Sequence, residues 1–116
     1  MKLWTFCALS AAVWLSGCGP STSQLRNDGI SAFQTGRMDE AAKLLQQVLD
    51  EKPSDAESLY YMGRIRQAEG AYEQAEFYYR CAIDADPRQR EAPVWLEKVR
   101  RQLGREAPVG PGRPAR

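Results

Sequence analysis

The sequence predicts an all-α protein made of two similar helical hairpins and one closing helix. Three observations support this prediction. Five residues recur with an offset of 34 positions, so that Leu25, Gly29, Gly36, Ala41 and Pro53 match Leu59, Gly63, Gly70, Ala75 and Pro87. Apolar residues within each copy follow three- and four-residue steps, which are typical of amphipathic helices. Glycines and prolines stand where helices of this length would end.

The first element is an N-terminal segment that precedes the hairpins. Leu3 to Leu15 holds 13 residues without a charge behind Lys2, whereas a membrane-spanning helix needs roughly 20 apolar residues. The motif Leu15-Ser16-Gly17-Cys18 follows directly and resembles the lipobox of bacterial lipoprotein signal peptides. The resemblance implies that Cys18 carries a diacylglycerol and that residues 1–17 are removed. An ordinary signal peptide, or a wrongly assigned start with a chance cysteine, is the alternative.

This signal would place the protein in the bacterial cell envelope as a lipid-anchored chain. More than one acyl chain converts reversible membrane binding into stable attachment. Gly19 after the modified cysteine favours the outer membrane, facing the periplasm, by resemblance to the sorting of proteobacterial lipoproteins. Residues 18–23 would be the lipidated cysteine and its linker, and the five residues after Cys18 reach roughly 17 Å at about 3.4 Å each. We therefore expect the folded part to stay close to the bilayer.

The first hairpin needs small residues and helix breakers at defined places. Gly29 and Ala41 lie where its two helices would cross most closely, and Gly36 supplies the left-handed turn at the end of the first helix. Pro53 ends the second helix. The buried face of that helix is predicted to carry Ala41, Leu44, Leu45, Val48 and Leu49.

The second hairpin repeats these devices after a new helix start. Residues 54–57 read Ser-Asp-Ala-Glu, which predicts a capping box with Ser54 at the N-cap. Gly63 and Ala75 allow the close crossing, Gly70 makes the turn and Pro87 ends the second helix. The predicted buried face holds Tyr72, Ala75, Tyr79, Ala82 and Ile83.

A closing helix and a tail follow the hairpins. The helix starts near Pro93, which is tolerated in a first helical turn. Its amphipathic face is predicted to carry Val94, Trp95, Leu96, Val99 and Leu103. Residues 104–116 have no apolar period and hold three prolines and three glycines, which predicts a disordered tail.

The 34-residue pattern resembles the tetratricopeptide repeat. The family pattern of large apolar, small, aromatic, Ala, bulky apolar and Pro positions falls on Leu25, Gly29, Ala32, Ala41, Leu45 and Pro53, and again on Leu59, Gly63, Arg66, Ala75, Tyr79 and Pro87. The departures are Leu in place of Trp, and Ala32 and Arg66 where an aromatic residue is common. The resemblance implies an array of two 34-residue repeats with a C-terminal capping helix over residues 24–103.

The resemblance also implies a binding groove, because the first helices of successive repeats line a concave surface in this family. The residues expected to face it are Arg26, Ile30, Phe33, Tyr60, Arg64, Gln67 and Lys98. Such a mixed aromatic and basic groove suits an extended or helical peptide with acidic and apolar residues. The alternative is that Phe33 packs within its hairpin and that Tyr60 and Arg64 stack on each other. The family's carboxylate clamp needs Asn at the places of Ile30 and Arg64.

Composition argues against several classes of function. The chain has no histidine, and after loss of Cys7 and modification of Cys18 only Cys81 remains as a thiol, so we expect no metal site, catalytic residue or cofactor. Cys81 is expected to be a packed, inert thiol or to form an intermolecular disulfide. Export and the lack of an evident stacking groove with interleaved basic residues disfavour nucleic-acid binding.

These features together predict a non-catalytic adaptor, scaffold or assembly factor that holds another envelope protein or peptide. A small core of about 80 residues also makes self-association possible. The alternative is a structural lipoprotein whose basic C-terminal end binds anionic lipid, lipopolysaccharide or peptidoglycan. That end carries Arg100, Arg101, Arg105, Arg113 and Arg116.

Overall fold

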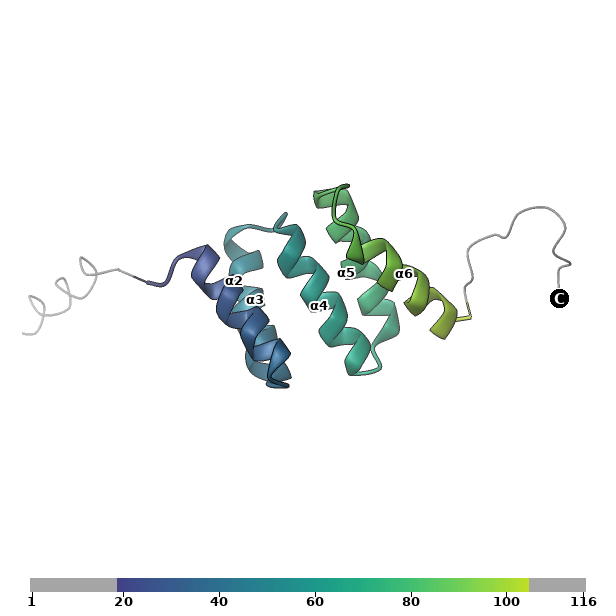
Figure 1. Ribbon diagram of the computed structural model, residues 1–116, viewed down its shortest axis with the longest axis horizontal. Helices are drawn as coiled ribbons and strands as arrows, with labels where there is room; N and C mark the ends of the chain where they lie inside the picture. The colour runs from purple at the N-terminus through teal and green to yellow at the C-terminus, as the bar shows by residue number, and fades with distance from the viewer. Residues whose placement is uncertain (1–18, 105–116) are drawn as a thin grey trace, which may run out of the picture.

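The computed structural model describes residues 19–104, which form five helices and no strand (Figure 1). The helices are α2 (Thr22–Gln34), α3 (Met38–Glu51), α4 (Ala56–Ala68), α5 (Tyr72–Ala85) and α6 (Glu91–Gln102). The predicted order of two helical hairpins and a closing helix is confirmed. The predictions for residues 1–17, for Cys18 and for residues 105–116 lie outside the described residues.

The helices stack in chain order. α4 lies between the α2–α3 hairpin and the α5–α6 pair, and it contacts all four of the other helices (Figure 1). α2 begins at Thr22, two residues before the expected boundary, because the Ser21 hydroxyl caps it by accepting from the backbone N–H of Gln24. Within residues 19–104, no helix is both long enough and apolar enough to cross a membrane.

Each hairpin turns at a glycine in the left-handed conformation, as predicted. The φ angle is 82° at Gly36 and 80° at Gly70. At the first turn, the backbone N–H of Arg37 donates to the carbonyl of Ala32, and that of Gly36 donates to the carbonyl of Phe33. These two bonds form a Schellman motif, and the second turn repeats it.

Glycines also allow the paired helices to approach, as the sequence predicts. A Cβ atom at Gly29 would lie 2.9 Å from the Leu45 side chain, and one at Gly63 would lie 2.6 Å from the Tyr79 ring. The residue opposite each glycine is therefore the bulky apolar residue of the second helix. Ala41 and Ala75 are fully buried nearby in the same core.

The expected buried faces are largely confirmed. Those fully or nearly fully buried are Ala41, Leu45, Val48 and Leu49 in α3, and Ala75, Tyr79 and Ala82 in α5. Leu44, Tyr72 and Ile83 are half-buried. In α6, Leu96 and Val99 are buried, but Val94 is 54% exposed, so its assignment to the packed face is wrong. Ala92, Leu96 and Val99 form that face, and Val94 lies two residues, about 200°, away from Ala92.

The predicted capping box at the start of α4 is wrong in its detail. Asp55, not Ser54, is the N-cap, and its carboxylate accepts from the backbone N–H and the hydroxyl of Ser58. Asp and Ser are equally good N-caps. Asp55 gains in addition an ion pair with Arg26 of α2, which explains why the cap falls there.

Candidate functional site

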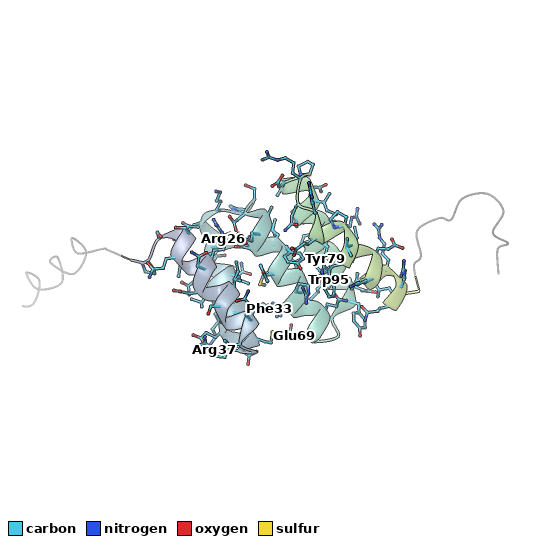
Figure 2. All side chains as sticks on the ribbon, viewed as in Figure 1. Arg26, Phe33, Arg37, Glu69, Tyr79 and Trp95 are labelled. Carbon is cyan, nitrogen blue, oxygen red and sulfur yellow. The ribbon has the colours of Figure 1, made fainter. Side chains whose placement is uncertain are left out.

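Arg64 lies at the centre of the surface formed by the first helices. Its guanidinium carbon is 3.6 Å from the ring centroid of Trp95 in α6 and 5.3 Å from that of Phe33 in α2. Arg64 belongs to α4, so one side chain joins three helices. Figure 2 shows Phe33 and Trp95 on either side of α4.

A second cation adds to this contact. The Nζ atom of the exposed Lys98 is 4.0 Å from the centroid of the Trp95 ring. Cation–π contacts contribute about 0.5–1 kcal/mol at exposed sites and about 2 kcal/mol or more when desolvated. Trp95 therefore holds two positive charges at the surface, and neither Arg64 nor Lys98 has a carboxylate partner among residues 19–104.

Two tyrosines, Tyr60 and Tyr61, pack beside the cations. The rings of Phe33 and Tyr61 meet edge to face at 5.3 Å, and those of Tyr60 and Tyr61 meet at 5.0 Å. Tyr60 is only 2% exposed, and its hydroxyl accepts from Arg64 at 2.9 Å. Burial raises the pKa of Tyr60 above its usual value, and the bond from Arg64 partly offsets that rise. The contact between Tyr60 and Arg64 that was the alternative to a groove-facing role is therefore present, together with the closer contact of Arg64 to Trp95.

We call this set of side chains the cationic-aromatic cluster. It consists of Phe33, Tyr60, Tyr61, Arg64, Trp95 and Lys98. Tyr61 and Trp95 are not among the expected groove residues. Trp95 was expected on the amphipathic face of the closing helix instead. The 34-residue offset could have found them, since it relates Tyr61 to Trp95 as it relates Arg64 to Lys98.

Gln67 lies beside the cluster and is held from two sides. The Tyr79 hydroxyl donates to its side-chain oxygen at 2.7 Å, and its amide donates to Gln102 of α6 at 2.9 Å. Burial raises the pKa of Tyr79 far above its usual value, so the phenol remains a hydrogen-bond donor. Gln67 thus connects the core of the second hairpin to α6.

Arg26 and Ile30 lie on α2, outside these contacts. Two nitrogens of Arg26 are each 3.0 Å from Asp55, and a third is 3.8 Å from Glu57. Burial alone would raise the pKa of Asp55, but the hydrogen bonds from Ser58 and the Arg26 charge outweigh it and hold that pKa below its usual value. Arg26 therefore bridges the two hairpins, and Ile30 is half-buried. Their roles in ligand binding stay predictions.

The remaining candidates lie away from this cluster. Within residues 19–104, no group of three or more His, Cys, Asp and Glu residues could hold a metal ion. Cys81 is half-buried, and burial raises the pKa of its thiol.

Arg100 lies 3.5 Å from Glu76 and Arg101 lies 3.7 Å from Glu97, so both described arginines of the basic end have acidic partners. Arg105, Arg113 and Arg116 lie outside the described residues.

Comparison with solved structures shows a known fold. The chain is similar to SycD, a type III secretion translocator chaperone of Yersinia enterocolitica. Two SycD structures match with a TM-score of 0.68 and 24% identity over 72% of this chain, and one of them is an alternative dimer. A third, SycD in complex with a peptide of the translocator YopD, matches with a TM-score of 0.67. This chain spans 64%, 57% and 63% of those chains, and at this identity the likeness shows the fold alone.

Comparison of the sequence itself identifies the family. No curated protein sequence matches this chain significantly. The family model of the tetratricopeptide repeat matches residues 32–92, which is more than half of the chain. The chain belongs to the tetratricopeptide repeat family.

Proposed function

We propose that this protein is a non-catalytic adaptor or assembly factor of the bacterial envelope. It binds an extended, acidic and apolar segment of another envelope protein, and Cys18 anchors it to the membrane. The observation that carries the proposal is Arg64, whose guanidinium joins Phe33 and Trp95 across three helices and has no carboxylate partner within residues 19–104.

The chemistry of the cluster favours such a ligand. Most of the other described arginines in the fold are paired, as Arg26 is with Asp55 and Arg66 with Glu69. Arg64 and Lys98 instead lie against aromatic rings, which leaves their N–H groups, apart from the one that Arg64 donates to Tyr60, for acceptors supplied from outside. The half-buried rings of Phe33, Tyr61 and Trp95 offer apolar area beside those charges. The SycD structure that contains a translocator peptide supports the proposal, since the same fold accommodates a peptide ligand.

Site-specific photo-crosslinking in cells tests the groove. A photoreactive residue at position 98 samples the cluster, and one at position 43 is the matched control, because Lys43 is also an exposed lysine and lies on α3. We expect position 98 to capture one envelope protein that position 43 does not. Capture of the same proteins from both positions, or of none from position 98, would contradict the proposal.

The membrane anchor needs a separate experiment. We expect Cys18→Ser to move the protein from the membrane fraction to the soluble fraction and to prevent removal of residues 1–17, because the thiol is the acceptor of the lipid that precedes cleavage. Cys81→Ser is the matched control, since Cys81 lies in α5. Unchanged membrane partitioning and size of the Cys18→Ser variant would refute the anchor and leave the groove proposal intact.

A further inference from the structure

Two neighbouring helices carry the same order of charge along one face. In α4 the order is Glu57, Tyr61 and Arg64, and in α6 it is Glu91, Trp95 and Lys98. Each series advances by four and then three residues, which keeps its members on one side of a helix. The two series are offset by 34 residues, so the two helices carry acid, ring and base in the same order, and Arg64 of α4 lies over the Trp95 ring of α6.

The acidic end of this surface contains a cavity. Its volume is about 210 Å³, and its lining residues are Ala56, Glu57, Tyr60, Tyr61, Asp86, Gln89 and Glu91. Three carboxylates therefore surround two phenol rings. Burial raises the pKa of Tyr61, and the nearby charges of Glu91 and Glu57 raise it further, while the Arg64 charge lowers it.

The ion pairs that Glu57 and Asp86 already make are weak enough to exchange. Glu57 is 3.8 Å from an Arg26 nitrogen, and Asp86 accepts from the side chain of Arg88 at 3.4 Å and from its backbone N–H at 3.0 Å. Arg88 is 93% exposed. Exposed ion pairs contribute about 0–1 kcal/mol, so a ligand cation seated on the rings can displace them. The rings add a cation–π contact that Arg88 does not make among the described residues.

The basic end lies two helical turns further along. Arg64 lies seven positions after Glu57, and Lys98 lies seven positions after Glu91, which corresponds to roughly 10 Å at about 1.5 Å per residue. A peptide in the extended polyproline II conformation covers about the same distance in three residues at about 3.1 Å each, and its side chains three residues apart lie on the same face. The surface therefore has a negative end and a positive end at a separation that a short extended segment can match.

We propose that this surface binds a peptide in the extended polyproline II conformation in a single direction, with a Lys or Arg side chain in the acidic cavity and an Asp or Glu side chain three residues away at Arg64 and Lys98. The inference rests on the proposed function and deepens it by naming the ligand's charge pattern. Charge complementarity fixes the direction, because a reversed peptide would place like charges together at both ends.

Selection from a phage-displayed library of random dodecapeptides tests the inference, with the purified full-length chain in detergent as bait. Among the selected peptides, we expect a base and an acid three residues apart to occur about fivefold or more often in one order than in the reversed order. Glu57→Gln/Glu91→Gln should remove the preference for a base and keep that for an acid.

The reciprocal variant and a control complete the design. Arg64→Gln/Lys98→Gln should remove the preference for an acid and keep that for a base. Asp39→Asn/Glu40→Gln on α3 should change neither preference, and circular dichroism should show the same helix content in all variants.

The outcomes separate this inference from the proposed function. Enrichment in acid alone, dependent on Arg64 and Lys98, would overturn the charge pattern and leave the adaptor proposal standing. A base and an acid enriched at a seven-residue spacing would replace the extended ligand with a helical one. Equal enrichment of both orders would overturn the single direction, and no selection at all would contradict the inference and the proposed function together.

Discussion

The two repeats share their helix ends but differ in the residue beneath the first-helix glycine. Leu45 lies below Gly29 in the first repeat, whereas Tyr79 lies below Gly63 in the second. Tyr79 is fully buried, and its hydroxyl donates a hydrogen bond to the side-chain oxygen of Gln67 on α4. The second repeat thus connects its core to the candidate binding surface, and the first repeat has no equivalent polar connection at Leu45.

The same difference holds at the surface. The position that is Ile30 in the first repeat is Arg64 in the second and Lys98 in α6, so only the second repeat and the closing helix carry positive charge at this position. The first repeat contributes one aromatic ring, Phe33, to the cluster. The turn glycines are thus copied between the repeats, whereas the core residue at positions 45 and 79 and the surface residue at positions 30 and 64 have diverged.

The largest effect is expected at the helix crossing of the second repeat. Gly63→Ala places a Cβ atom 2.6 Å from the Tyr79 ring, which the bond to Gln67 holds in place. We expect it to lower the free energy of unfolding by about 2–3 kcal/mol, as over-packing does. Gly29→Ala meets the Leu45 side chain at 2.9 Å, and that side chain can shift.

Thermal unfolding of both variants checks this order. One kcal/mol corresponds to about 4–8 °C in a domain of this size, so the midpoint should fall by about 10 °C or more for Gly63→Ala and by about 5 °C or less for Gly29→Ala. Equal decreases of the midpoint in both variants would show that the two cores tolerate a methyl group equally. That result would contradict the expected difference between Leu45 and Tyr79.

The contact between the repeats should depend on pH through a carboxylate that has no equivalent at the start of α6. Asp55 pairs with Arg26, but the residue 34 positions later is the neutral Gln89. Because the pKa of Asp55 is lowered in the folded protein, its contribution is complete above the unfolded pKa of about 3.9 and is lost as the pH falls through the folded value.

Asp55→Asn isolates this contribution, because Asn is also a good N-cap. We expect a loss of about 2 kcal/mol at pH 7, as for other hydrogen bonds to charged groups, and a progressively smaller difference below about pH 4. Urea unfolding at a series of pH values measures it, with Gln89→Glu as a variant that should not reproduce the effect. A difference that is constant from pH 7 to pH 3 would contradict the role of the Asp55 charge.

A smaller loss of stability is expected at the two turns, and it should be the same at both. Gly36 and Gly70 have nearly the same φ, and a Cβ atom at either one would meet no other atom. Replacement by Ala should therefore cost only the backbone strain, about 1 kcal/mol at each position. Thermal midpoints that differ between the two variants by more than about 5 °C would show that the turns are not equivalent.

The scaffold could be predicted from the sequence because its signals are local or repeated. The glycines at 36 and 70 and the apolar faces of α3 and α5 follow directly from helical geometry. The N-cap of α4 was assigned wrongly because Ser54 and Asp55 are both suitable, and the choice depends on Arg26 from another helix.

The candidate site was predicted less completely, because a face of a helix does not show which side chains find partners within the fold. Arg26 and Arg64 look alike in the sequence, yet Arg26 meets Asp55 and Arg64 meets Trp95. Tyr60 was expected to face the groove and is instead nearly buried beneath Arg64. Only the packing of α2, α4 and α6 against one another separates these roles.

Arg64 provides the most direct test of the central claim. Arg64→Ile gives the second repeat the residue of the first, and Arg66→Gln on the same helix is the matched control, since Arg66 pairs with Glu69. The measured quantity is the yield of the partner captured by the photoreactive residue at position 98, with circular dichroism to confirm folding. We predict that Arg64→Ile lowers the yield by about tenfold or more and that Arg66→Gln changes it by less than about twofold. Full capture by a folded Arg64→Ile variant would contradict the account.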